Sequence, residues 1–344
     1  MSSVSATIIN GSGVVTLRGN FLVKAVSVRP QTGTRERSPS KNYGKEAKKS
    51  MRKHWQLYLL VLPPVLFFIL FKYLPMANAV LAFKNYQVTK GIWGSPWVGT
   101  KYFDMLFNNP QFLTLIKNTL FLSLYQLAAT FPIPIILALL LNEVRSLRFK
   151  KAVQLITYAP FFISTVVMVS IIMIFLAPRL GLLNVILNAL GMESTNFLGD
   201  PNKFRSVYVW AEVWQTTGYS CVIYLAALAG VDPSLYEAAK VDGASRLQKI
   251  INVDIPGILP AAVIILILSV GNIMSLGFEK VYLLQNPLNL QSSEIISTYV
   301  YKIGLLNANY SFATAVGLFN SVINLILLVA VNAVSRRISE NSLW

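Results

Sequence analysis

Few side chains in this chain of 344 residues could do chemistry. It has one histidine, His54, and one cysteine, Cys221, so an internal disulfide, a multi-histidine metal site and a Ser-His-Asp triad are excluded. A phosphate-binding loop needs Gly-x-x-x-x-Gly-Lys-Ser/Thr, but the one Gly-Lys pair, Gly44-Lys45, is followed by Glu46. We therefore expect no catalytic residue, no metal and no cofactor in this chain.

Residues 231–256 form a polar segment between two apolar runs. Asp232 is suited to capping a helix and Pro233 to its first turn. The pattern predicts a short amphipathic helix over residues 234–242 that ends at Gly243, where the chain can turn. A short, rigid helix that projects from a membrane can dock in a groove of a soluble partner and transmit that partner's motion.

Composition indicates a membrane protein, because 54% of the residues are hydrophobic, 13% are charged and the mean hydropathy is +0.56. A helix needs about 20 mainly apolar residues to cross the hydrocarbon layer. Six stretches satisfy this condition: residues 55–74, 118–141, 155–177, 206–230, 257–276 and 312–334. We predict an all-α integral membrane protein with a six-helix domain over residues 55–334, whose second span is bent by Pro132 and Pro134.

Lys and Arg are distributed unevenly about these spans. Eleven precede the first span, four lie at 145–151, three lie in 231–256 and two follow the last span, while the other ten fall mostly in connections at about 75–117, 178–205 and 277–311. Short cytoplasmic loops and tails retain positive charge. Both termini and the 231–256 loop are therefore predicted to be cytoplasmic, and the three longer connections external.

The tails account for much of the net charge of +16. Residues 1–54 are predicted to be a basic cytoplasmic tail, of which 1–50 show no sustained helical or strand period and are expected to be disordered. Met51 is followed by basic residues and then directly by the first apolar run, which would be a good start for a membrane protein. We therefore expect Met51 to be the true initiator. Residues 335–344 form a second tail. Anionic lipid headgroups explain these charges better than nucleic acid, because no soluble domain is available to carry a basic face.

Glu212 is the one ionisable residue near the middle of a predicted span. We expect it to face the external vestibule or to pair with a neighbour such as Arg205, and a substrate contact is the alternative. An ion-coupled carrier would hold ionisable residues deep in several spans. Their absence disfavours a secondary carrier. A structural or scaffold membrane protein is disfavoured as well, because it would need no coupling loop.

The spacing within the 231–256 loop resembles the cytoplasmic EAA loop of permease subunits in binding-protein-dependent ABC importers. Glu237-Ala238-Ala239 is followed by Gly243 and then by Val253 and Ile255-Pro256, where the family usually has Ile and Leu in place of Val253 and Ile255. The resemblance implies a type I ABC importer permease fold in the bacterial plasma membrane. The alternative is an ordinary helix-turn-helix loop with a solvated glutamate.

The same resemblance implies roles for the loop residues. Glu237 would pair with a basic residue of a nucleotide-binding subunit, Ala238 and Ala239 would permit close approach, and Gly243 would set the turn. ATP and Mg would be bound by those partner subunits. The residues expected to couple this chain to the ATPase are Glu237, Ala238, Ala239, Asp242, Gly243, Val253 and Pro256.

A second resemblance narrows the class. The stretch Gly277-Phe-Glu-Lys-Val-Tyr-Leu-Leu-Gln-Asn-Pro287, together with Tyr73-Leu-Pro-Met76 and Thr157-Tyr-Ala-Pro160, is similar to carbohydrate-importer permeases of the LplB-like group, which are MalF-type subunits without the large extra external domain. The likeness covers residues 51–344. It implies a second, usually non-identical permease, two ATP-binding subunits and an external solute-binding protein that delivers a saccharide derived from an oligo- or polysaccharide. An amino acid or phosphate cargo is the main rival.

The external 277–310 loop is where contact with the delivery protein is expected, at Tyr282, Gln285 and Asn286, although it could be a plain connector. Saccharides are bound by aromatic faces with amide and hydroxyl groups. Trp210, Trp214 and Gln215 are expected near one helix face. An interfacial aromatic belt and interhelical hydrogen bonds are the alternative explanation. The candidates for the substrate path are Tyr125, Gln126, Trp210, Trp214, Gln215, Tyr219, Asn272, Asn320 and Asn324.

Overall fold

The structure, a computed structural model, describes residues 6–10, 13–17 and 53–338. It divides into two units, Met1–Phe67 and Phe68–Trp344. The initiator hypothesis at Met51, residues 339–344 of the second tail and most of residues 1–50 lie outside the described residues.

The described part of the N-terminal tail is a β-hairpin, which differs from the expected lack of strands. β1 (Ala6–Asn10) pairs antiparallel with β2 (Gly13–Leu17), and Asn10 lies opposite Gly13. The sequence reason is that β-branched residues flank the Asn-Gly-Ser-Gly segment at 10–13, which is the composition of a tight hairpin turn.

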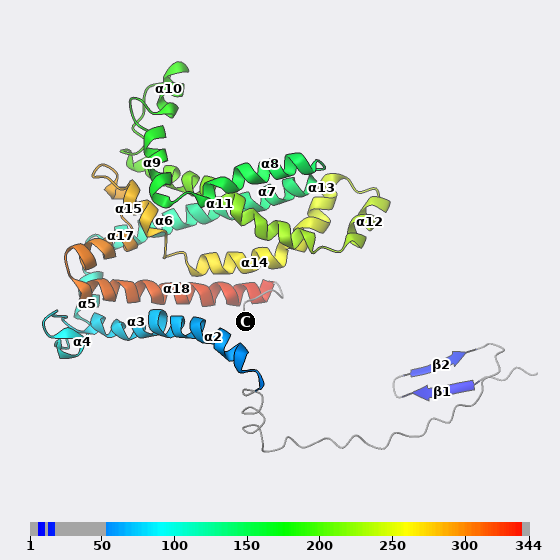
Figure 1. Cartoon of the computed structure of the whole chain (residues 1–344), viewed down its shortest axis with the longest axis horizontal. Helices are drawn as coiled ribbons and strands as arrows, with labels where there is room; N and C mark the ends of the chain where they lie inside the picture. Colours follow the sequence, from blue (N-terminus) through cyan, green and yellow to red (C-terminus); the bar gives the residue numbers. More distant parts are fainter. Residues whose placement is uncertain (1–5, 11–12, 18–52, 339–344) are drawn as a thin grey trace, which may run out of the picture. The chain divides into compact units, whose positions relative to one another are not determined.

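The rest of the described chain is helical (Figure 1). Its helices are α2 (Trp55–Phe68), α3 (Leu74–Met76), α4 (Gly91–Gly94), α5 (Lys101–Phe107), α6 (Phe112–Thr130), α7 (Pro132–Glu143), α8 (Leu147–Tyr158), α9 (Thr165–Phe175), α10 (Leu182–Ala189), α11 (Pro201–Ala229), α12 (Pro233–Val241), α13 (Arg246–Lys249), α14 (Ile255–Gly271), α15 (Phe278–Leu284), α16 (Leu290–Ser293), α17 (Ile296–Tyr301) and α18 (Tyr310–Ile338). Several of them continue as 3₁₀-helical segments, at Ala77–Phe83 and Ala159–Phe162, or as π-helical segments, at Ile69–Tyr73, Ile250–Asp254 and Lys302–Leu306.

Helices occupy all six stretches predicted to cross the membrane. Within the described residues, four helical segments are long and apolar enough to cross alone: Trp55–Phe83, Phe112–Glu143, Arg246–Gly271 and Tyr310–Arg337. Two bent pairs bring the number to six if each counts as one span. From residue 53 to residue 338 the chain therefore has the predicted all-α, multi-span character.

The third span is not the continuous helix predicted over 155–177. α8 and α9 meet at an angle of 103°. Pro160 lies in the turn between them, and Ser164 caps α9 by accepting a hydrogen bond from the Val167 N–H at 3.4 Å. The backbone leaves the helical region at Ile163 and Ser164, whose ψ angles are 130° and 150°, and because Ser164 caps a new helix directly, the chain restarts in another direction.

The second span has a discontinuity where its prolines predicted one. α6 ends at Thr130, and α7 begins at Pro132 after the single intervening residue Phe131. The fifth span ends at Gly271, before the predicted 276, because a turn begins there. The side chain of Asn324 in α18 stabilises this turn by accepting a hydrogen bond from the Met274 N–H at 3.0 Å.

α11 is the central element of the unit that begins at Phe68. It packs against α6, α7, α8 and α14, while α14 and α18 lie side by side (Figure 1). Buried side chains such as Leu122, Tyr208 and Tyr224 fill the contacts around α11. At Gly218 the backbone of α11 approaches Thr157 so closely that a Cβ atom would overlap the Thr157 carbonyl. Only glycine fits there.

Two polar loops lie at opposite ends of this bundle. Figure 1 shows α12 and α13 at the end where α7 terminates, and α15 and α17 at the opposite end. The predicted cytoplasmic loop and the predicted external loop therefore lie at opposite ends of the same helices, as two sides of a membrane require.

Candidate coupling and translocation site

The helix predicted within the 231–256 loop is α12, and its ends are set by local chemistry. Asp232 is its N-cap, because the Asp232 carboxylate accepts a hydrogen bond from the Ser234 N–H at 2.9 Å. This bond lowers the pKa of Asp232. At the other end Gly243 adopts a φ of +71°, which side-chain-bearing residues rarely adopt. The chain then turns into α13, which begins with a capping box between Ser245 and Gln248.

α12 is held against the bundle by a cluster of polar residues. The Tyr236 hydroxyl donates a hydrogen bond to the Asp254 carboxylate at 2.6 Å, and the Asn142 amide donates to the same oxygen at 3.3 Å. Asp254 is fully buried, and Lys249 forms an ion pair with Glu143. Burial and the neighbouring Asp254 raise the pKa of Tyr236 to about 12. We call Asn142, Glu143, Tyr236, Lys249 and Asp254 the latch, because they tie α12 to the ends of α7 and α14.

The opposite face of α12 is exposed. Glu237 and Ala238 are exposed, as are Val241, at 87%, and Leu235, at 50%. Ala239 is half-buried and lies on the latch side of the helix. Of the other residues expected in coupling, Asp242 is exposed at the C-cap, Val253 is buried at the start of the fifth span and Pro256 is exposed.

Glu212 pairs with Lys280, which lies 68 residues later in α15, and not with Arg205. The Lys280 side chain is 6% exposed, and its ammonium also donates to the Gln215 amide oxygen at 2.6 Å, while the Gln215 amide nitrogen donates to the Ile163 carbonyl at 2.9 Å. Arg205 instead donates to Asn118 at 3.0 Å. The sequence suggested Arg205 because it is near in the chain, but the loop after α14 folds back onto α11.

The aromatic candidates on α11 do not share one face. Trp210 and Trp214 line an apolar cavity of about 490 Å³ against α9, whereas Gln215 faces Lys280. Tyr219 stacks on Phe161 with ring centroids 3.9 Å apart. The expectation for Trp210, Trp214 and Gln215 was wrong because five residues advance a helix by about 140°, which takes Gln215 round to a different side from Trp210.

Two small polar cavities adjoin one another between α6, α11 and α14. One, of about 240 Å³, is lined by Gln126 and Asn272, and the other, of about 270 Å³, is lined by Gln126 and Glu212. Thr130 and Ser269 line both. Gln126 accepts a hydrogen bond from the Tyr208 hydroxyl at 3.3 Å. The structure thus brings Gln126, Asn272 and Glu212 to one polar region inside the bundle.

The other candidates for the substrate path do not line these cavities, although Asn324 bonds to Ser275, which lines the first of them. The Tyr125 hydroxyl is 3.5 Å from Ser206 Oγ, and the Asn324 amide donates to Ser275 Oγ at 2.7 Å. The Asn320 side-chain oxygen is buried and has no hydrogen-bond partner in the described part of the chain.

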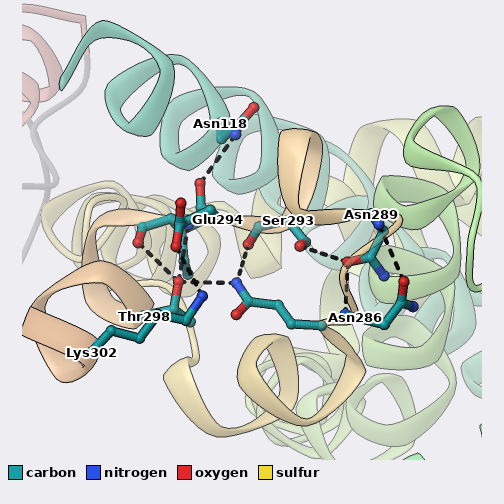
Figure 2. Close-up of polar contacts among 9 residues, drawn as sticks. Asn118, Asn286, Asn289, Ser293, Glu294, Thr298 and Lys302 are labelled. Atoms are coloured by element: carbon teal, nitrogen blue, oxygen red, sulfur yellow. Dashed lines mark hydrogen bonds and ion pairs between the residues drawn. The ribbon is translucent and has the colours of Figure 1, made fainter. Parts of the chain in front are cut away.

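The external loop is internally cross-linked by polar side chains (Figure 2). Gln285 donates to the Ser293 carbonyl at 2.8 Å and to Thr298 at 3.1 Å, and Asn286 donates to the Leu198 carbonyl at 2.8 Å. Asn118 of α6 donates to the Glu294 carbonyl at 3.1 Å, and Glu294 pairs with Lys302 at 2.9 Å. Gln285 and Asn286 therefore shape the loop. Tyr282 packs with Phe278 and Tyr301, with ring centroids 5.3 and 5.0 Å away.

Residues 130–340 match the family described as binding-protein-dependent transport system inner membrane component. The chain belongs to this family. The permease is 46% identical over 288 residues to the polygalacturonan/rhamnogalacturonan transport system permease protein YteP of Bacillus subtilis (strain 168). The match covers 84% of this chain and 90% of that protein. It is 42% identical over 293 residues to protein LplB of the same organism, which covers 85% and 92% respectively.

A solved structure extends the similarity to three dimensions. The permease matches a chain of a bacterial ABC transporter involved in the import of the acidic polysaccharide alginate, with a TM-score of 0.79, 40% identity and coverage of 86% of this chain and 99% of that chain. A second structure shows that alginate transporter with an alginate pentasaccharide-bound periplasmic protein, with a TM-score of 0.79 and 39% identity. The family resemblance carried by the EAA spacing and the expected permease fold are confirmed.

Sequence reasoning predicted α12 in the permease but missed the latch and Lys280. Asp254 had a detectable signal, since a carboxylate at the entry to an apolar span needs a partner. Lys280 had a similar signal, because a lysine within an aromatic and apolar stretch is rarely buried unless it is paired. In both cases the sequence predicts the need for a partner but cannot identify the partner.

Proposed function

We propose that this permease forms half of the translocation path for an acidic oligosaccharide in an ATP-driven importer. Its partners would be a second permease, two ATP-binding subunits that bind ATP and Mg, and an external binding protein that delivers the cargo. The membrane is the bacterial plasma membrane, with both termini and α12 on the cytoplasmic side. No residue of this chain makes or breaks a bond.

The observation that carries the proposal is the geometry of α12. The helix lies beyond the end of α11, its inner face is fixed by the latch, and its outer face presents Glu237, Ala238 and Val241. A soluble subunit docked on that outer face can move α12 only together with the ends of α7 and α14, because the latch joins them. Motion of the ATPase would therefore change which side of the membrane the polar region around Gln126 faces.

Cargo class is supported by charge and by relatives. The predicted external connections at 75–117, 178–205 and 277–311 carry nine basic and five acidic residues, which favours approach of an anionic ligand. Relatives are named for polygalacturonan, rhamnogalacturonan and alginate. In the proposed cycle a loaded binding protein docks outside, ATP closes the partner ATPase pair, α12 moves with it, and hydrolysis resets the transporter.

The test is ATPase stimulation in proteoliposomes that contain the permease, its companion permease, the ATPase and the binding protein. We expect acidic oligosaccharides such as galacturonate or alginate oligomers to stimulate hydrolysis, and Gly243→Asp to abolish stimulation without loss of assembly. Gly91→Asp is the matched control, because Gly91 also has a positive φ, +66°, and open space around its Cβ position, but lies outside the coupling loop.

Each other outcome would change a specific part of the proposal. Equal stimulation in the Gly243 variant and wild type would mean that the coupling loop is assigned wrongly. Stimulation by neutral saccharides alone would contradict the acidic cargo. A permease that transports without associating with any ATPase would be a secondary carrier.

A further inference from the structure

A polar cavity of about 610 Å³ lies between the coupling loop and the connection from α7 to α8. It is separate from the polar region around Gln126. It is lined by Asn142, Glu143, Val144, Arg145, Tyr236, Ala239, Lys240, Gly243, Ala244, Ser245, Arg246 and Lys249. We call this cavity the basic cleft.

The charge of the basic cleft is only partly neutralised. Its lining includes four cations, and one of them, Lys249, is paired with Glu143. The side chains of Arg145, Lys240 and Arg246 have no ion pair or hydrogen bond within residues 53–338. The nearby Asp254 carboxylate does not line the cleft and is bound by Tyr236 and Asn142. Three positive charges therefore face a space large enough for a ligand.

The location of the basic cleft indicates its ligand. It lies where α7 ends and α14 begins, which is the headgroup level of the leaflet that the proposed orientation makes cytoplasmic. Leu147, Phe149 and Leu247 are exposed at 70%, 59% and 66%, so apolar side chains on the flanking α8 and α13 are available to acyl chains. Basic pockets between spans on the cytoplasmic side are typical sites for anionic lipid headgroups.

The ATPase is a less suitable occupant, because the more exposed residues expected to meet it, such as Glu237 and Ala238, lie on the other side of α12, although Ala239 and Gly243 line the cleft. On a helix of 3.6 residues per turn, Tyr236 and Lys240 face the cleft while Ala238 and Val241 point away from it. We propose that the basic cleft binds the phosphate headgroup of an anionic membrane lipid, such as phosphatidylglycerol, beside the latch. This inference rests on the proposed orientation and assembly.

The experiment is native mass spectrometry of the assembled importer after exchange into mixed micelles with phosphatidylcholine and increasing phosphatidylglycerol. Wild type should retain phosphatidylglycerol, and Lys240→Gln/Arg246→Gln should weaken its apparent affinity about tenfold or more, because each basic residue near an anionic lipid contributes appreciably. Lys240→Arg/Arg246→Lys keeps the charge and should bind as wild type does. Arg336→Gln/Arg337→Gln removes two cytoplasmic cations that do not line the cleft, and should leave retention unchanged.

The same spectra show whether the ATPase subunits remain attached, so failure of the assembly is distinct from failure of lipid binding. Equal loss of lipid in the cleft variant and the Arg336/Arg337 control would overturn the site. Competition by millimolar inorganic phosphate that removes the lipid would indicate a soluble anion as the occupant. Loss of the ATPase with unchanged lipid retention would assign the cleft to the ATPase instead.

Discussion

The ion pair between Lys280 and Glu212 allows a quantitative test, because it joins the external loop to the central helix. Lys280 is 6% exposed and Glu212 is 20% exposed. In Lys280→Met, the Glu212 carboxylate would lose its cation and Gln215 would lose a hydrogen-bond donor. Removing one partner of a buried pair typically destabilises by about 3–5 kcal/mol, because the remaining charge stays desolvated. We expect a value near the lower end, since Glu212 is in part accessible from the polar cavity that it lines.

The double variant Lys280→Met/Glu212→Gln should behave differently. It removes both charges and keeps similar volumes, a change that is often close to neutral. The free energy of unfolding of wild type, both single variants and the double variant can be measured by equilibrium unfolding in mixed micelles. The double variant should recover most of the stability lost by Lys280→Met. A double variant as unstable as the sum of the two single variants would refute the reasoning, because independent sites give additive effects.

Three further variants test other parts of the structure. Tyr236→Phe removes the 2.6 Å hydrogen bond to buried Asp254, so we expect about 1–3 kcal/mol of destabilisation and weaker ATPase stimulation in proteoliposomes. The control Tyr58→Phe, on an exposed side chain, should change neither quantity. The pKa of Asp232 is lowered by its bond to Ser234, so its capping of α12 is fully present above the usual carboxyl pKa and is lost as pH falls through the lowered value. The protection factors of the α12 amides, which are exchange rates corrected for the intrinsic effect of pH, should therefore fall over that acidic range in wild type, whereas those of Asp232→Ala should be low at every pH. Gly218→Ala places a Cβ against the Thr157 carbonyl and should lower the free energy of unfolding by about 1–3 kcal/mol, whereas Gly317→Ala should not, because the space around its Cβ position is open. Similar effects of the two variants would contradict the packing of α11 on α8.

The features that sequence predicted correctly are those set by neighbouring residues. Asp232, Pro233 and Gly243 fix both ends of α12 locally, so their positions suffice to predict the helix. The turn that divides α6 from α7 follows in the same way from Pro132. The spans followed from apolar run length, which the membrane thickness determines.

The features that sequence missed depend on contacts between distant segments. Lys280 meets Glu212 only because the loop after α14 returns to α11, and no local pattern records that approach. The bend between α8 and α9 was missed because the apolar run continues through Pro160, and run length alone does not show direction. Asp254 was assigned to the loop, although it is buried and bonded to Tyr236.

α11 is one uninterrupted helix, so it can tilt as a rigid body. Its 29 residues span about 44 Å at 1.5 Å per residue, with no proline after the first turn. Arg205 binds α6 near one end, Lys280 binds near the middle, and a short turn after the other end leads into α12. A tilt of about 5° around the midpoint would displace each end by about 2 Å in opposite directions. A rigid bar of this kind turns a small push at one membrane surface into an equal, reversed displacement at the other.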